Sequence, residues 1–160
     1  MDMKVCKFGG SSLGESQRLE QILDILRRDS SRRCVVVSAP GKSDTAPVKV
    51  TDLLISAVRK RLAGGSSEED AQAVRKRFHD VYDPLSVTPA DLDEILEDLD
   101  ARLEADTDNP ARFRDRVVAA GEALNARAFA LFLNARGIEA DPIDPGEAGL
   151  CVTAEFGNAR

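Results

Sequence analysis

The chain opens with two apolar runs on either side of one amphipathic segment. Residues 3–8 predict a short strand, and the β-branched run at residues 34–37 predicts a strand covered on both faces. Between them, residues 17–29 carry apolar side chains at helical spacing, with charged side chains on the opposite face. A strand, a helix and a second strand in this order build a parallel sheet with a right-handed crossover. We therefore predict an α/β fold.

The rest of the chain is mostly helical in pattern. Thr51 or Asp52 is expected to cap the helix that follows the second strand, Gly121 to interrupt the last helix, and Gly137 to end it. We expect helices over residues 51–62, 68–82, 89–105 and 113–136, and further strands over residues 138–143 and 150–153. The predicted architecture is a three-layer α/β/α sandwich with a mainly parallel sheet. It is incomplete in this chain and carries a helical excursion over residues 51–105.

Charge and hydropathy exclude several classes of protein. The 160 residues include 28 acidic and 22 basic side chains, a formal charge of -6. Nucleic acid is therefore not expected as the main partner, because phosphate binding needs clustered, unopposed lysine and arginine. No run approaches the roughly 20 apolar residues that span a bilayer, and the start lacks the pattern of a signal peptide. We expect one cytoplasmic domain with no membrane partner.

Cysteine and histidine give no metal or nucleophile motif. Cys6, Cys34 and Cys151 lie far apart in apolar contexts, so we expect buried, reduced thiols rather than disulfides or a zinc site. His79 is the single histidine, and we assign it no role.

Lys7 occupies the penultimate position of the first predicted strand, directly before a glycine loop. A lysine in a buried strand is costly unless its charge is compensated. Either a structural ion pair or an anion at the loop would compensate it, because amides that open a helix favour negative charge. Ligands of open α/β sheets bind at the carboxyl ends of strands, so this turn is the most informative place in the chain.

Neither standard phosphate motif fits. A dinucleotide fingerprint needs a third-position glycine, and Ser11 stands there between Gly9 and Gly14. Residues 41–43 (Gly-Lys-Ser) are similar to the end of a P-loop, but Val36 replaces the earlier glycine that this motif requires. We reject both interpretations.

Four segments, in order, resemble those of aspartate kinases in the amino acid kinase family. Residues 7–12 (Lys-Phe-Gly-Gly-Ser-Ser) are similar to the signature that opens those enzymes. The other similar segments are residues 37–42 with 49–54, residues 121–126 (Gly-Glu-Ala-Leu-Asn-Ala) and residues 152–159. Each match alone is weak, but together they span nearly the whole chain.

The resemblance implies phosphoryl transfer from ATP to the side-chain carboxylate of L-aspartate, giving 4-phospho-L-aspartate for lysine, threonine and methionine synthesis. It implies ATP and Mg²⁺ as cofactors. Lys7 matches the cation that stabilises the phosphoryl group, and its neighbours match the nucleotide-binding loop. The site residues implied by the resemblance are Lys7, Phe8, Gly9 and Gly10 for ATP, and Ser11, Ser38, Thr51 and Glu122 for aspartate.

Structural explanations compete with some of these roles. Thr51 is also suited to cap a helix, and Ser38 is also suited simply to end a strand. Glu122 is expected within an apolar helix, where a carboxylate is unusual and favours a functional role. Lys42 and Lys49 are expected to be solvated, although basic residues here would also attract anionic substrates.

The resemblance covers only part of the family's catalytic domain. We expect residues 1–160 to be its N-terminal portion, without the C-terminal nucleotide-binding half and the ACT regulatory domains, and to be inactive alone. The full-length enzyme is expected to be a homo-oligomer, and the missing remainder of the domain to be a partner. Two alternatives are a non-catalytic binding or scaffold module and another kinase of the family, one that acts on glutamate or carbamate.

Overall fold

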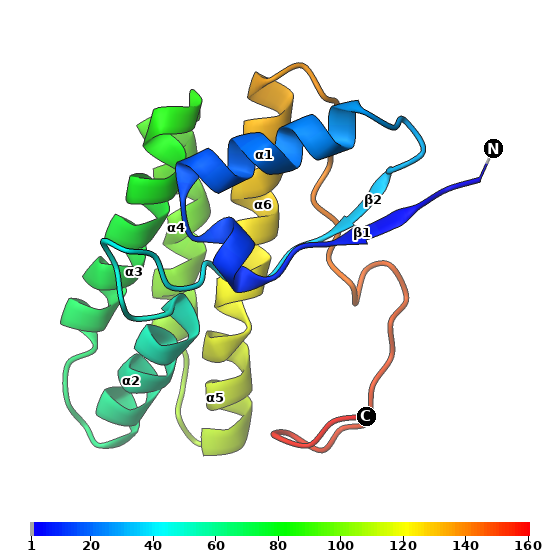
Figure 1. Cartoon of the computed structure of the whole chain (residues 1–160). Coiled ribbons are helices and arrows are strands. Elements are labelled where there is room, and N and C mark those ends of the chain that lie inside the picture. The colour runs from blue at the N-terminus through cyan, green and yellow to red at the C-terminus, as the bar shows by residue number, and fades with distance from the viewer. Residues whose placement is uncertain (1) are drawn as a thin grey trace.

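The computed structural model describes residues 2–160 and shows an α/β fold built from a small parallel sheet and a larger group of helices (Figure 1). In chain order the elements are β1 (Val5–Lys7), the 3₁₀ helix η1 (Gly10–Leu13), α1 (Ser16–Arg27), β2 (Cys34–Val36), α2 (Val50–Leu62), α3 (Glu68–Tyr82), the 3₁₀ helix η2 (Asp83–Leu85), α4 (Pro89–Leu103), α5 (Pro110–Val118) and α6 (Ala120–Ala135). The predicted opening of strand, helix and parallel strand is confirmed.

The two strands pair in parallel with Val5 opposite Cys34 and Lys7 opposite Val36. Their next residues therefore leave the sheet at the same edge, which is where the glycine loop begins. Val35 contacts the helical core, whereas Val36 is 45% exposed. The prediction that residues 34–37 form a strand covered on both faces is therefore wrong within this chain, because the face with Val5 and Val36 is open.

Local signals in the sequence set several helix ends. The Thr88 side chain accepts a hydrogen bond from the Asp91 amide (3.2 Å) at the start of α4, and Asn109 does the same for Arg112 (3.0 Å) at the start of α5. Gly137 follows α6 with a φ of 78°, which ends the helix as predicted. Between the helices lie large, fully buried aromatic side chains: Phe78, Tyr82, Phe113 and Phe132.

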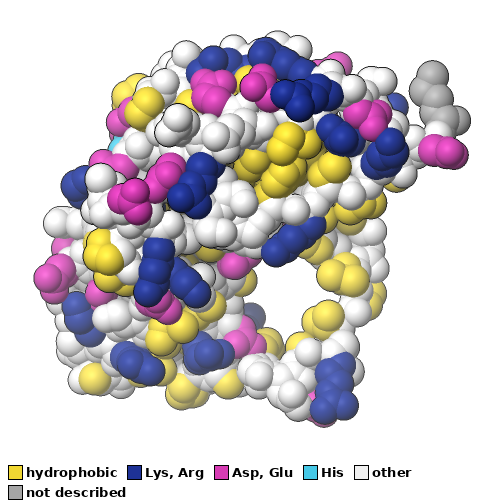
Figure 2. All heavy atoms as spheres, viewed as in Figure 1, with side chains coloured by type: hydrophobic (Ala, Val, Ile, Leu, Met, Phe, Trp, Pro, Cys, Tyr) yellow, Lys and Arg dark blue, Asp and Glu magenta, His cyan; other side chains and the backbone are white. Residues whose placement is uncertain are grey.

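The strands predicted over residues 138–143 and 150–153 are absent from the described residues. Strand pairing needs a neighbouring backbone, and here the N–H and C=O groups of Ala140 are both bound by the side chain of Asn134, over 3.0 and 2.8 Å. Residues 141–160 are exposed throughout. Figure 2 shows an open gap between this segment and the helices, and the segment meets α5 where the Gly157 amide donates to Asp115 Oδ2 (2.5 Å).

Three other local predictions need correction. Lys49, rather than Thr51 or Asp52, is the N-cap of α2, because the helix begins at Val50. The break between α5 and α6 comes at Ala119, before Gly121. The three cysteines are free, but none is buried as predicted: Cys6 and Cys34 are half-buried in the strands, and Cys151 is exposed in the segment that leaves the helices. No helix within residues 2–160 combines the length and the apolar character needed to cross a bilayer.

Candidate functional site

Lys7 ends β1 with its side chain exposed and turned back over the loop that follows. A Cβ atom built on Gly9 would lie 3.5 Å from Lys7 Nζ, so the ammonium group sits beside the Gly9 backbone. The prediction of a buried lysine is wrong, because the outer face of the sheet is open. No carboxylate within residues 2–160 comes within ion-pair distance of Lys7, whereas Lys4 in the same segment pairs with Asp29 (2.7 Å). The structure therefore gives Lys7 no structural ion pair.

Three consecutive backbone amides lie next to Lys7. The N–H groups of Gly9, Gly10 and Ser11 find no acceptor in the described part of the chain, since they precede the first hydrogen-bonded turn of η1. That turn is closed by the bond from the Ser12 amide to the Gly9 carbonyl (2.9 Å). Free amides beside an ammonium group form a small region of positive potential at the carboxyl edge of the sheet.

Residues 38–41, which follow β2 after Val37, connect this loop to three helices. The Ser38 carbonyl accepts from Asn125 Nδ2 on α6 (2.7 Å), and the Ala39 amide donates to Glu122 Oε1 on α6 (3.4 Å). The Pro40 carbonyl accepts from the Val50 amide at the start of α2 (3.2 Å). The amide of Gly41 donates to the Gly10 carbonyl (2.8 Å), and the carbonyl of Gly41 accepts from Arg77 on α3 (3.0 Å). We call residues 38–41 the hub segment.

Two glycines allow the close contacts on which the hub segment depends. A Cβ atom on Gly41 would lie 2.5 Å from the carbonyl carbon of Gly10, so the two backbones are in direct contact. On the other side, a Cβ atom on Gly121 would lie 2.8 Å from Ala39 Cβ. Gly121 therefore lets the start of α6 pack against the hub segment, which brings Glu122 to the end of β2.

The hub segment gathers the sequence-predicted site residues around one edge of the sheet. Phe8 is half-buried, and its amide donates to the Val36 carbonyl (2.9 Å), which ties the start of the loop to β2. Ser11 is exposed and Ser38 is half-buried. Thr51 lies in the first turn of α2, directly after Val50, and its hydroxyl has no hydrogen-bond partner within residues 2–160. Capping therefore does not explain Thr51.

Glu122 reaches the same edge, but in a different setting from the one predicted. It is exposed and stands in the first turn of α6, not buried within an apolar helix, because the helix begins at Ala120. A carboxylate in a first turn is stabilised by the helix dipole. Burial therefore does not indicate a function for Glu122, whereas its contact with the Ala39 amide places it at the end of β2.

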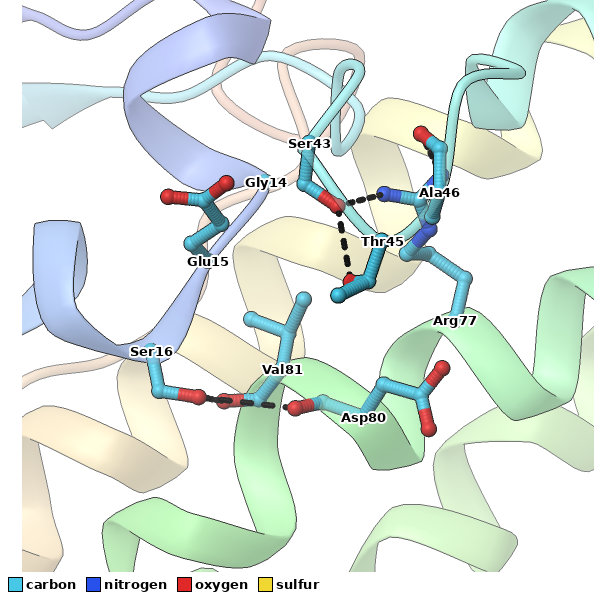
Figure 3. A pocket seen from close by; sticks show the side chains of 9 residues that line it. All are labelled: Gly14, Glu15, Ser16, Ser43, Thr45, Ala46, Arg77, Asp80 and Val81. Atoms are coloured by element: carbon cyan, nitrogen blue, oxygen red, sulfur yellow. Dashed lines mark hydrogen bonds between the residues drawn. The ribbon is translucent and has the colours of Figure 1, made fainter.

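Lys42 and Lys49 are exposed in the loop after the hub segment, as expected for solvated residues. A cavity of about 170 Å³ lies between this loop, the start of α1 and the C-terminal part of α3. Figure 3 shows the side chains around it, Arg77 and Ser43 among them. None of the sequence-predicted site residues lines it.

Sequence reasoning assigned no role to three residues that organise the site. Gly41 belongs to the rejected P-loop pattern and to the similar segment 37–42, neither of which indicates its contact with Gly10. Asn125 is completely buried, and it accepts from the Tyr82 hydroxyl (2.6 Å) while donating to Ser38. Burial raises the pKa of the Tyr82 phenol far above its ordinary value, which keeps that donor protonated. Arg77 had a visible signal, because it occupies the buried face of α3 between Val74 and Val81.

The fold and the site together define a class: an α/β protein whose first parallel strand ends at a lysine and a glycine-rich turn with free amides. Residues 2–159 match the amino acid kinase family. The chain therefore belongs to the amino acid kinase family.

Individual relatives agree with this membership. The chain is 42% identical to aspartokinase 3 of Bacillus subtilis (strain 168) over 158 residues, which cover 99% of this chain and 35% of that protein. The crystal structure of Clostridium acetobutylicum aspartate kinase is 28% identical with a TM-score of 0.71, covering 81% of this chain and 29% of that one. E. coli aspartokinase III, solved with lysine and aspartate, has the same fold: its TM-score is 0.80 at 24% identity, covering 100% of this chain and 35% of that one. The chain thus spans about a third of the length of these proteins.

Proposed function

We propose that this chain forms the aspartate-side part of an aspartate kinase, which transfers the γ-phosphoryl group of ATP to the side-chain carboxylate of L-aspartate. The observation that carries the proposal is the convergence of Lys7, the free amides of the glycine loop, Thr51 and Glu122 around the hub segment. The 42% identity to an aspartokinase over nearly the whole chain supports this choice over other members of the family.

Both reactants are anionic, so the reaction depends mainly on positioning and charge neutralisation. A side-chain carboxylate oxygen of aspartate attacks the γ-phosphorus, the bond from phosphorus to the β–γ bridging oxygen breaks, and ADP leaves. In the proposal, the Lys7 ammonium group neutralises charge on the transferring phosphoryl group, because it has no carboxylate partner of its own in the described chain. The free amides of Gly9 and Gly10 bind phosphate oxygens.

The remaining predicted residues are proposed to bind aspartate. Glu122, exposed at the hub segment, is suited to bind the α-ammonium group. Ser11, Ser38 and Thr51 offer hydroxyl groups at the same edge of the sheet, and Thr51 has its hydroxyl free of capping. We propose that the residues that bind the rest of ATP and of aspartate lie outside this chain, which covers 35% of the length of a related aspartokinase.

The described residues do not provide a metal site of their own. No group of three or more His, Cys, Asp or Glu side chains within residues 2–160 is placed to hold a metal ion. Mg²⁺ typically binds through substrate phosphates and one or two carboxylates. We therefore propose no residue of this chain as a ligand of Mg²⁺.

Exposed apolar side chains support the proposed extent of the domain. Val5 and Val36 lie on the open face of the sheet, and Ile143, Val152 and Phe156 are exposed in the C-terminal segment. Exposed apolar surface of this kind commonly marks a binding surface. We propose that the remainder of the catalytic domain covers it, and that the 160 residues alone do not turn over. Assembly into a homo-oligomer stays a prediction for the full-length enzyme.

The deciding experiment measures ATP-dependent formation of aspartyl phosphate by the natural polypeptide that carries these residues. Lys7→Ala is expected to lower kcat/KM by about 100-fold or more, the size of effect seen when one stabilising donor is removed. Lys4→Ala is the matched control, because it removes an equal charge that already pairs with Asp29. Faster phosphorylation of glutamate or carbamate than of aspartate would show that the protein is another kinase of the family. Absence of any kinase activity would favour the binding or scaffold module.

A further inference from the structure

Arg77 is a buried charge without a carboxylate partner in the described chain. Its side chain is on the core-facing side of α3, and the residue is only 5% exposed. Burial lowers the pKa of its guanidinium group, an effect opposed by the charges of Asp80 and Glu15. Burying a charge is unfavourable unless hydrogen bonds satisfy it. The contacts that satisfy Arg77 therefore indicate why the residue is there.

All these contacts go to the loop over residues 41–48. Nη1 donates to the Gly41 carbonyl (3.0 Å) and to Ser43 Oγ (3.4 Å). Nη2 donates to the carbonyls of Ala46 (2.9 Å) and Val48 (2.6 Å). Figure 3 shows Arg77 reaching from α3 toward the part of this loop that carries Ser43 and Ala46. A single side chain thus binds both ends of the loop and fixes it to α3.

The contact with Gly41 leads on to the glycine loop. Arg77 binds the Gly41 carbonyl, and the Gly41 amide donates to the Gly10 carbonyl (2.8 Å). That carbonyl belongs to the peptide group between Gly10 and Ser11. In a planar trans peptide the C=O and N–H groups point in opposite directions. Holding the Gly10 carbonyl against Gly41 therefore directs the Ser11 amide away from Gly41, to the open side of the loop.

We propose that Arg77 is a positioning residue for the phosphate-binding loop: by holding Gly41 against Gly10, it fixes the direction of the free Ser11 amide. The inference rests on the proposed function, since it takes the glycine loop to be the ATP site. Arginine suits this role because its planar fork presents five donors in a fixed geometry, whereas lysine presents one ammonium group. Ser43, Thr45 and Ala46 line the cavity of about 170 Å³ beside Arg77, so this part of the loop has room to move when the hold is released.

The first test is amide hydrogen exchange followed by NMR in the 160-residue chain. Arg77→Met keeps the apolar stem and removes every donor, and Arg77→Lys keeps the charge without the fork. Arg75→Met is the matched control, because Arg75 is on the same helix but pairs with Asp100 on α4. We expect the Gly41 amide to exchange about tenfold faster or more in both Arg77 variants, as in a local opening. Core amides such as that of Phe129 should keep the wild-type rate.

The second test is steady-state kinetics of the same variants in the natural polypeptide that carries these residues. Arg77→Lys should raise KM for ATP about tenfold, because a glycine loop that opens more often holds its amides in the binding geometry less of the time. KM for aspartate should change less than KM for ATP, because Ser38 and Ala39 are held separately by Asn125 and Glu122 and only Ser11 among the proposed aspartate-binding residues belongs to the glycine loop. A role that is only structural would instead lower kcat through a smaller active fraction and leave both KM values unchanged.

The outcomes separate this inference from the proposed function. A Gly41 exchange rate within twofold of wild type in Arg77→Lys, or an unchanged KM for ATP, overturns the inference. If Arg77→Met fails to fold, Arg77→Lys alone decides. If the wild-type polypeptide forms no aspartyl phosphate, the proposed function fails, and the positioning role for an ATP site fails with it. In that case the exchange experiment still decides whether Arg77 holds Gly41 against Gly10.

Discussion

Asn125 and Glu122 lie one turn apart on α6 and bind the two ends of the same peptide group. Asn125 Nδ2 donates to the Ser38 carbonyl (2.7 Å), and the amide of the next residue, Ala39, donates to Glu122 Oε1 (3.4 Å). Residues three apart on a helix face the same side, so one face of α6 fixes the orientation of this peptide. The end of β2 is thereby attached to the helix that supplies the proposed aspartate-binding carboxylate.

Asn125→Ala is expected to lower the free energy of unfolding by about 2 to 3 kcal/mol, because it leaves the buried Tyr82 hydroxyl and the partly buried Ser38 carbonyl without their partner. Tyr82→Phe removes a single donor to Asn125 and should cost about 1 to 2 kcal/mol. Urea unfolding monitored by circular dichroism measures both. A loss below about 0.5 kcal/mol for Asn125→Ala would show that the buried hydrogen bonds do not hold the end of β2.

Gly41→Ala and Gly9→Ala form a matched pair, because a Cβ atom at position 41 would meet the Gly10 backbone and one at position 9 would meet no backbone atom. A Cβ atom at position 41 would lie 2.5 Å from the Gly10 carbonyl carbon, so the backbones must separate at a cost of about 2 kcal/mol or more. A Cβ atom at position 9 meets only the flexible end of Lys7 at 3.5 Å, and the stability change should stay within about 0.5 kcal/mol. Thermal and urea unfolding distinguish the two. Equal losses would mean that the backbone contact is not what requires glycine at position 41.

Thr51→Val tests whether the hydroxyl has a structural or a functional role. Since Lys49 is the N-cap of α2, losing the hydroxyl should change stability by less than about 0.5 kcal/mol. Thr88→Val is the control, because Thr88 does cap α4 through the Asp91 amide, and its loss should cost about 1 kcal/mol. If Thr51 binds aspartate as proposed, Thr51→Val also raises KM for aspartate and Thr51→Ser restores it. A variant with lower stability but unchanged KM contradicts the functional role.

The parts of the fold that were predictable depend on neighbours along the chain. Helical periodicity is local, and it predicted α3 with its observed bounds and α4 with its observed start. Residues 138–143 also have the local pattern of a strand. A strand needs a partner backbone, however, and the backbone of Ala140 instead binds the Asn134 side chain. An extended pattern alone therefore does not establish a strand.

The organisation of the candidate site was not predictable in this way, because its contacts join distant parts of the chain. Asn125 and Ser38 are 87 residues apart in sequence, and Arg77 and Gly41 are 36 apart. A motif identifies Lys7 and the glycine loop as a candidate anion site, but which helix holds that loop depends on packing. Arg77 was the one clue, since a charged side chain interrupts the buried face of α3. A charged residue on the buried face of a helix therefore predicts hydrogen-bond acceptors from a distant part of the chain.

His79 links α3 to the next two elements and makes stability depend on pH. Its Nδ1 and Nε2 atoms lie 3.0 Å from Asp83 in η2 and from Asp93 in α4. Burial lowers the pKa of His79, but hydrogen bonds to the two carboxylates outweigh it, and the pKa is raised above its ordinary value. A raised pKa means that the protonated histidine stabilises the fold. This contribution is complete below the unfolded pKa of about 6.5 and is lost as the pH rises through the higher folded value.

His79→Gln should therefore cost up to about 1 kcal/mol at about pH 6 and less at about pH 9, since the pair is only partly buried. Lys76→Met is the control: it breaks the pair with Asp80 (2.6 Å) on the same helix, and neither partner is a histidine, so its cost should be the same at the two pH values. Urea unfolding at the two pH values gives both differences. A His79→Gln loss as large at the higher pH as at the lower would show that the protonated ring does not hold α3 to α4.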